Sequence, residues 1–131
     1  TRYIGVTGVQ TCALPILALL GDFNIAPDDR DVYDPAGWAG KVLCSAPERA
    51  AFQRLVAMGL ADSYRHFHAD GGQYSWWDYR AAGFRRNLGL RIDLALVSDA
   101  LAPHAMAAGI DREPRTWDRP SDHAPVWVEL G

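Results

Sequence analysis

Three short polar clusters stand at the ends of apolar stretches and contain side chains that hydrolytic chemistry uses. Asp22 and Asn24 lie in a Gly-Asp-Phe-Asn segment, Asp93 lies in Arg-Ile-Asp-Leu, and Asp122 precedes His123 between two prolines. Carboxylates and an amide oxygen are ligands for hard cations such as Mg²⁺. A carboxylate beside an imidazole also forms a general acid–base pair. Together these groups suit the metal-assisted attack of water on a phosphodiester.

Each cluster taken alone has an ordinary structural explanation. Asp22 and Asn24 fit a turn, because both residue types favour turns. Asp93 can pair with a nearby arginine, and Asp122 with His123 fits a polar surface turn. The joint occurrence of the three clusters at strand ends, where α/β proteins build their sites, favours the catalytic interpretation.

Composition narrows the class of protein. The chain of 131 residues is long enough for one domain, and 49% of its residues are hydrophobic, as in soluble globular proteins. The net charge is −3, so contact with a polyanion would need a local basic patch or a bound cation. Cys12 and Cys44 lack the spacing of a zinc site, which indicates a reducing, cytoplasmic setting without a disulfide framework. No stretch approaches the roughly 20 apolar residues of a membrane span, so no membrane association is expected.

The apolar pattern predicts an α/β domain whose strands carry the three clusters. A helix is expected to begin after Ser45, with Pro47 in its first turn, and to end at Gly59. A short helical turn is expected to open at Ser98 and to end at Pro103. Strands are expected at 17–20, 60–63, 74–79, 90–97, 107–110 and 126–130, and loops at 27–40, 65–73, 81–88 and 111–120.

Residues 1–16 fit this pattern poorly. They show no helical or strand period, and residues 4–16 closely resemble a translated sequencing adapter. We therefore interpret 1–16 as a non-native N-terminal segment and 17–131 as the domain. A native but irregular arm is the alternative, and continuous genomic reads across Leu17 would support it.

Four segments carry a family resemblance: GDFN at 21–24, YSWWDYR at 74–80, NLGLRIDL at 87–94 and SDHAPVW at 121–127. Together they resemble the C-terminal half of bacterial exodeoxyribonuclease III, in the abasic-site branch of the endonuclease/exonuclease/phosphatase superfamily. The resemblance spans residues 17–131. It implies an α/β fold that is half of a four-layer sandwich, with one mostly antiparallel or mixed sheet and flanking helices, truncated.

The resemblance also implies catalytic roles for the matching residues. Asp22 would orient or deprotonate the attacking water, and Asn24 would help hold the scissile phosphate. His123 would contact that phosphate, and Asp93 would orient His123. The implied metal set, for Mg²⁺ or Mn²⁺, is Asp22, Asn24, Asp122 and His123.

The implied substrate contacts lie in the two middle segments. Trp76 would line the pocket for a flipped-out abasic sugar, whose extrusion costs least where no base is stacked. Asn87 would also contact substrate, and Arg85, Arg86 and Arg91 would form the local basic patch that holds phosphates. Arginine-rich loops that only face solvent are common, so the patch has a plain alternative.

The implied activity is that of a monomeric, cytoplasmic DNA-repair nuclease. It would hydrolyse phosphodiesters 3′→5′ and 5′ of abasic sites in double-stranded DNA. Family members are about twice as long, on the scale of a large single domain. Their N-terminal half supplies an Asn, a metal-binding Glu and a catalytic Tyr without counterparts here. We therefore expect an incomplete cation site, an inactive chain and an uncovered apolar sheet face.

Three other interpretations stay open at this point. The chain can be a catalytically dead fragment, or a DNA-binding module that uses Trp76 and the arginines without cleavage. It can also be a superfamily relative that acts on lipid or small phosphodiesters, although the segments at 74–80 and 87–94 argue against this.

Overall fold

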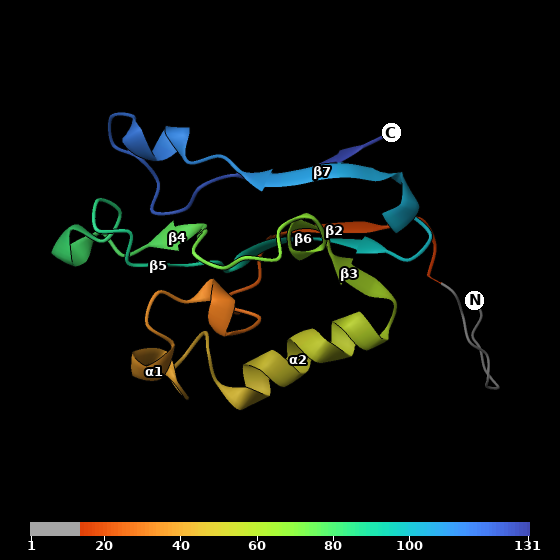
Figure 1. Cartoon of the computed structure of the whole chain (residues 1–131), viewed down its shortest axis with the longest axis horizontal. Coiled ribbons are helices and arrows are strands. Elements are labelled where there is room, and N and C mark those ends of the chain that lie inside the picture. Colours follow the sequence, from red (N-terminus) through yellow and green to blue (C-terminus); the bar gives the residue numbers. More distant parts are fainter. Residues whose placement is uncertain (1–13) are drawn as a thin grey trace.

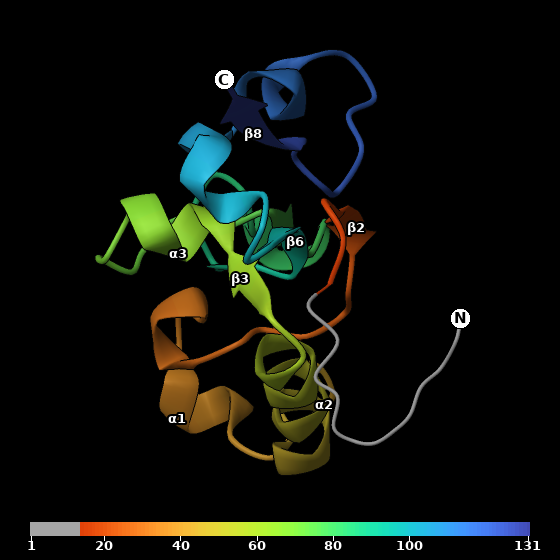
Figure 2. The same ribbon diagram turned by 90° about the vertical axis from the view of Figure 1, so that its right-hand side faces the viewer.

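A three-stranded antiparallel sheet forms the middle layer of the computed structural model, which describes residues 14–131. Its strands are β2 (Ala18–Asp22), β6 (Asp93–Ser98) and β3 (Leu60–Asp62), in the order β2-β6-β3. Helix α2 (Ala46–Ala57) lies on one side of this sheet, and the pair of strands β7 (Ala105–Ile110) and β8 (Val126–Leu130) lies on the other (Figures 1 and 2). The predicted α/β class with antiparallel strands is confirmed.

Strand β6 is central because all six of its residues, DLALVS, are buried and the four in the middle are apolar. It pairs with β2 in a register that runs from Ala18 opposite Val97 to Asp22 opposite Asp93. The predicted strand at 17–20 is confirmed and extends to Asp22. The strand expected over 90–97 is divided, because Leu90 belongs to β5 (Gly89–Leu90) and β6 begins only at Asp93. The register brings the polar end of β2 directly against the polar start of β6.

Helix α2 begins and covers the sheet as its sequence predicts. Ser45 caps the helix, and Glu48 completes a capping box, since each side chain accepts a hydrogen bond from the other's backbone N–H. Phe52 is buried and packs with Leu60, Leu94 and Leu96 of the sheet. The helix therefore holds one face of β6 in place.

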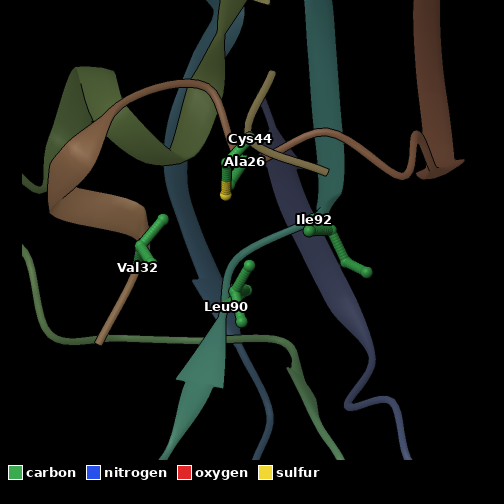
Figure 3. Close-up of a cluster of buried hydrophobic side chains, with 5 residues drawn as sticks. All are labelled: Ala26, Val32, Cys44, Leu90 and Ile92. Atoms are coloured by element: carbon green, nitrogen blue, oxygen red, sulfur yellow. The ribbon is translucent and has the colours of Figure 1, made fainter. Parts of the chain in front are cut away.

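A second buried cluster attaches the loop after β2 to the start of the next strands. Its members are Ala26, Val32, Cys44, Leu90 and Ile92, and Figure 3 shows them gathered beside β5. The region expected to be plain loop, 27–40, also contains the 3-10 turn η1 (Asp29–Asp31) and helix α1 (Pro35–Trp38). That part of the prediction was wrong, because Asp28 and Asp34 each cap a short helix with their side chains.

Two further strand pairs complete the described part of the chain. Strand β4 (Trp76–Trp77) pairs with β5 (Gly89–Leu90), so the strand expected over 74–79 is shorter than predicted. Strand β7 (Ala105–Ile110) pairs with β8 (Val126–Leu130), as expected. Helix α3 (Ser63–Phe67) includes the last residue of the predicted strand 60–63 and the first three of the predicted loop 65–73, so both predictions were wrong there. The remaining elements are the 3-10 turns η2 (Arg80–Ala82), η3 (Ala102–His104) and η4 (Glu113–Thr116).

Two further predicted boundaries concern the end of a helical turn at Pro103 and the end of the N-terminal segment at residue 16. Pro103 lies inside η3 and does not end it, because proline suits the first turn of a helix. The proposed non-native segment 1–16 falls mostly on residues outside the described part of the chain, and it stays a prediction. Within residues 14–131 no helix is long and apolar enough to cross a membrane.

A buried ionic cluster joins the loop after β2 to the sheet. Asp31 is fully buried and accepts a 2.7 Å hydrogen bond from Arg91 Nε, and it also pairs with Arg65. Arg91 Nη2 lies 2.6 Å from Asp62 Oδ2 at the end of β3. Burial alone would lower the pKa of Arg91, but the hydrogen bonds and charges of Asp62 and Asp31 raise it. The guanidinium is therefore a permanent cation.

Replacement of Asp31 by Asn should strongly destabilise the fold, because it removes the charge that compensates buried Arg91. We expect the free energy of unfolding, measured by urea denaturation, to fall by about 3 kcal/mol or more. The control is Arg80→Gln, which breaks the exposed Arg80–Asp78 pair and should cost little, because exposed ion pairs contribute little to stability. Equal losses in the two variants would contradict a special role for the buried cluster.

Candidate active site

Three of the predicted catalytic side chains converge where β2 ends and β6 begins. His123 Nδ1 lies 2.8 Å from Asp93 Oδ2, and His123 Nε2 lies 3.7 Å from Asp22 Oδ2. One potential ligand atom from each residue lies within 4.8 Å of the other two. Residues 22, 93 and 123 thus form one polar cluster, while their catalytic roles stay predictions.

The backbone around each residue explains this convergence. Asp22 stands opposite Asp93 in the β2–β6 register. Asp22 Oδ1 accepts a 2.9 Å hydrogen bond from the amide of Asn24, whose positive φ of 53° suits asparagine in a turn. The amide of Asp93 donates to Ser75 Oγ at 2.9 Å, which fixes the start of β6. The cluster is therefore held mainly by backbone geometry.

Asp122 connects this cluster with the aromatic segment. Trp76 Nε1 donates a 3.0 Å hydrogen bond to Asp122 Oδ2, and Asp122 Oδ1 lies 3.9 Å from His123 Nε2. Trp76 and His123 also face each other in an antiparallel bridge. The half-buried ring of Trp76 thus lies beside the catalytic candidates, as a substrate contact would require.

The pKa values of the pair follow from burial and charge. Burial raises the pKa of Asp93 above its ordinary value, although the hydrogen bond with His123 opposes this. Burial alone would lower the pKa of His123, but the hydrogen bond to Asp93 and the charges of Asp93, Asp22 and Asp122 raise it. Because a carboxylate only accepts hydrogen bonds, Nδ1–H of His123 must donate to Asp93. This leaves Nε2 on the open side.

A hollow of about 410 Å³ opens beside the cluster. Asp93 and His123 line it together with the edge of β2 and the start of β8. A group that enters the hollow can therefore reach the imidazole. The remaining lining residues are Leu20, Gly21, Ser121, Ala124, Pro125 and Val126.

The predicted substrate residues separate into two groups. Arg85 and Arg86 are exposed on the loop between β4 and β5, where a phosphate can reach them. Asn87 Oδ1 accepts a 3.1 Å hydrogen bond from Trp77 Nε1, so this amide supports the aromatic segment. The assignment of Arg91 to a phosphate-binding patch was wrong. Its side chain is 1% exposed, and each of its three nitrogens donates a hydrogen bond to a carboxylate, of Asp31 or Asp62.

Sequence reasoning missed Ser75. Its side chain is fully buried, and its Oγ accepts the amides of both Ile92 and Asp93. Its own backbone O accepts the amide of Ala124 at 2.7 Å. Ser75 thus joins the strand of Asp93 to the loop of His123. The only signal in the sequence was a small hydroxyl between two large aromatic residues.

The donor set suits a divalent cation. Asp22 is exposed, Asp93 is nearby, and both offer hard carboxylate oxygens beside one imidazole nitrogen. Asn24 lies on the same turn as Asp22 and can add an amide oxygen. Mg²⁺ and Mn²⁺ both accept such donors. The group is therefore a candidate metal centre.

Comparison with known proteins identifies relatives over most of the chain. Residues 7–123 match the model of the Endonuclease/Exonuclease/phosphatase family. Exodeoxyribonuclease III of Haemophilus influenzae is 43% identical over 123 residues, which cover 88% of this chain and 46% of that protein. The exodeoxyribonuclease of Bacillus subtilis is 39% identical, with 82% and 42% covered.

Solved structures agree with these relatives. A Neisseria 3′ phosphatase, NExo, bound to a product DNA hairpin, is similar with a TM-score of 0.87 and 52% identity over 88% of this chain and 45% of its own. An AP endonuclease from Archaeoglobus fulgidus gives a TM-score of 0.82 at 31% identity, with the same 88% and 45% covered. The predicted family resemblance and fold class are confirmed. The chain spans about 45% of the length of these relatives.

The pKa of His123 gives a test of the cluster in metal-free protein. We expect the imidazole to titrate above its ordinary value of about 6.5. Because the folded-state pKa is raised, the pair should stabilise the fold below about pH 6.5 and lose that effect as pH rises through the raised pKa. Asp93→Asn should lower the pKa of His123, which NMR titration of the imidazole in chelator measures. Asp111→Asn, on an exposed residue, is the control, and an unchanged titration in Asp93→Asn would contradict the pairing.

Proposed function

The chain belongs to the Endonuclease/Exonuclease/phosphatase family, and from this premise we propose that it supplies the C-terminal part of a divalent-metal-dependent DNA-repair nuclease. The proposed reactions are 3′→5′ hydrolysis of phosphodiesters and cleavage 5′ of abasic sites in duplex DNA. The observation that carries the proposal is the convergence of Asp22, Asp93 and His123 beside Trp76. The names of the relatives as exodeoxyribonucleases and AP endonucleases support it.

Each member of the cluster has a proposed task that its geometry permits. Asp93 accepts the Nδ1–H of His123 and so fixes the ring with Nε2 directed away, where it can donate to a phosphate oxygen. Asp22 is exposed, so its carboxylate can orient a water and accept its proton. We assign the attack on phosphorus to that water: its oxygen forms the new P–O bond, its proton passes to Asp22, and the P–O3′ bond breaks. The leaving 3′ oxygen takes up a proton and becomes a 3′ hydroxyl.

The cation belongs on the same side of the cluster. Asp22 and Asn24, with Asp122 and His123 near them, would hold Mg²⁺ or Mn²⁺. When bound, the cation supplies positive charge against the scissile phosphate. Asp93 also lies within ligand distance of this group, although its Oδ2 is occupied by His123.

The aromatic segment is the proposed substrate side. Trp76 is fixed by Asp122 and can pack against an extruded abasic sugar. Arg85 and Arg86 are placed to neutralise phosphates along the duplex, and Asn87 can offer its amide nitrogen to the same backbone. This local patch would hold DNA despite a net charge of −3.

We also propose that the 131-residue chain alone does not turn over. The cluster holds two carboxylates and one imidazole, whereas the family resemblance implies a further metal-binding Glu from the N-terminal half of the fold. DNA binding without cleavage is then the function of the chain by itself. The exposed Arg85 and Arg86 favour this second possibility.

The main test uses a hybrid that joins residues 17–131 to the N-terminal half of the Neisseria exonuclease. The hybrid should nick an abasic duplex in Mg²⁺ and lose this activity in chelator. His123→Ala should lower kcat by about 10²-fold to 10⁴-fold, because a proton-donating group is lost. Gel assays of a labelled duplex measure both effects.

His104→Ala is the matched control, since His104 is an exposed residue of η3 whose Nδ1 contacts the carbonyl of Gly131. It should leave kcat unchanged. A hybrid that neither nicks an abasic duplex nor removes nucleotides from 3′ ends in Mg²⁺, or one untouched by His123→Ala, would refute the nuclease assignment. Robust nicking by the 131-residue chain alone would refute its proposed inactivity.

Arg85→Gln and Arg86→Gln should each weaken binding of duplex DNA to the 131-residue chain in chelator. Each lost phosphate contact should reduce the slope of log affinity against log salt by about one. Fluorescence anisotropy across a salt series measures the slope. Arg54→Gln removes an exposed arginine from α2 as the control and should leave the slope unchanged. Equal slopes in all variants would exclude the basic patch.

A further inference from the structure

Arg115 in η4 is a buried cation without a carboxylate partner among the described residues. Arg115 is only 7% exposed, and its Nη1 donates a 2.8 Å hydrogen bond to the carbonyl of Ser121. Its Nε is buried with no hydrogen-bond partner. The guanidinium lies 4.6 Å from the ring centre of Phe84 and 5.7 Å from those of Trp77 and Tyr79.

In this environment the charge of Arg115 contributes little to the stability of the fold. Burial of a cation with an unpaired N–H is costly, and the aromatic rings offset only part of that cost. A methionine of similar length would fill the same space without the loss of hydration. What arginine alone provides at this place is a rigid donor to the carbonyl of Ser121.

Ser121 belongs to the segment that carries the catalytic candidates. Its Oγ accepts the amide of His123 at 3.0 Å. Three consecutive carbonyls of this segment are each fixed by a donor from outside it. Tyr79 Oη donates to Pro120 at 2.7 Å, Arg115 donates to Ser121, and the amide of Trp77 donates to Asp122 at 3.1 Å.

Arg115 differs from the other two donors in one respect. The hydroxyl of Tyr79 and the amide of Trp77 both come from the aromatic segment that is already bound to Asp122 through Trp76. Arg115 comes from η4, a different element, although its guanidinium packs against the rings of Trp77 and Tyr79. Its bond therefore ties η4 to the segment 120–123.

We infer that Arg115 is a positioning residue of the proposed nuclease, which acts through the Ser121 carbonyl to fix the backbone that presents Asp122 and His123. The inference rests on the proposed function for its catalytic meaning. Loss of the donor should let the backbone of this segment shift slightly, while every proposed catalytic side chain remains present. Such a shift should affect the chemical step more than substrate binding.

The chain offers a matched control in Arg112. Its guanidinium also lies over Trp77 and Phe84, at 5.3 Å and 4.9 Å, and it is one turn away on the same segment. The described hydrogen bonds include none from its side chain to residues 120–123. Substitution of Arg112 thus removes the same kind of ring contact but leaves the Ser121 carbonyl bound.

The kinetic test compares Arg115→Met, Arg115→Lys and Arg112→Met in the hybrid enzyme with an abasic duplex. Arg115→Met should lower kcat by about tenfold to a hundredfold with KM within about twofold. Arg115→Lys keeps a donor and should recover part of kcat. Arg112→Met should stay within about twofold of the parent in both constants. Unchanged kcat in Arg115→Met, or an equal loss in Arg112→Met, would overturn the inference.

A second measurement does not depend on catalysis. The Nδ1–H of His123, bound to Asp93, should give a slowly exchanging downfield proton resonance in ¹⁵N-histidine-labelled hybrid, assigned with His123→Ala. We expect that resonance to broaden or vanish in Arg115→Met and to persist in Arg112→Met. Its persistence in folded Arg115→Met and Arg115→Lys would overturn the positioning role.

The two measurements separate this inference from the nuclease proposal. Suppose that the parent hybrid fails to nick DNA, and that the His123 resonance is present in it and is lost only on substitution of Arg115. This result would refute the nuclease proposal and support the positioning role of Arg115. If Arg115→Met does not fold, Arg115→Lys decides, because it keeps the charge but loses the planar guanidinium: a lowered kcat with unchanged KM supports the inference, and a kcat equal to that of the parent overturns it.

Discussion

The ion pairs of Arg91 are the constraint on which the rest of the structure depends. Its guanidinium joins Asp31, in the loop after β2, to Asp62 at the end of β3, and its backbone amide donates to the Asp31 carbonyl. Buried pairs of this kind often return no more free energy than their desolvation costs. We therefore interpret them as specifying which loop packs against which strand. Because Arg91 precedes Asp93 by two residues, the same pairs fix the point at which β6 begins.

From that point the constraint passes to the active site through backbone contacts. Ser75 accepts the amides of Ile92 and Asp93 on one side and the amide of Ala124 on the other. The strand of Asp93 and the loop of His123 are thus held by a single buried residue. The short distance between the two side chains follows from this shared support, so the pair is held in one geometry.

The sequence predicted the parts of this arrangement that depend on local pattern. Polar residues at the ends of apolar strands indicated Asp22, Asp93 and His123, and the structure gathers them. It did not predict the burial of Arg91, because its partners Asp31 and Asp62 are 60 and 29 residues away. The roles of Ser75 and Arg115 were not predicted for the same reason, since tertiary packing determines their hydrogen-bond partners. The short helix α1 was a different error, because Asp34 before Pro35 is a local helix-start signal.

The β2–β6 register also explains why the site lies where it does. Like charges directly opposite each other in an antiparallel pair are destabilising, yet Asp22 stands opposite Asp93. A shift of one residue would separate the carboxylates, but it would turn every side chain of β2 to the other face of the sheet. In the register that the fold adopts, burial and the charge of Asp22 both raise the pKa of Asp93. Positive charge beside the two carboxylates relieves their repulsion, whether it comes from the His123 imidazolium or from a divalent cation. The close approach of two carboxylates in this register is thus what makes the place attractive to positively charged groups.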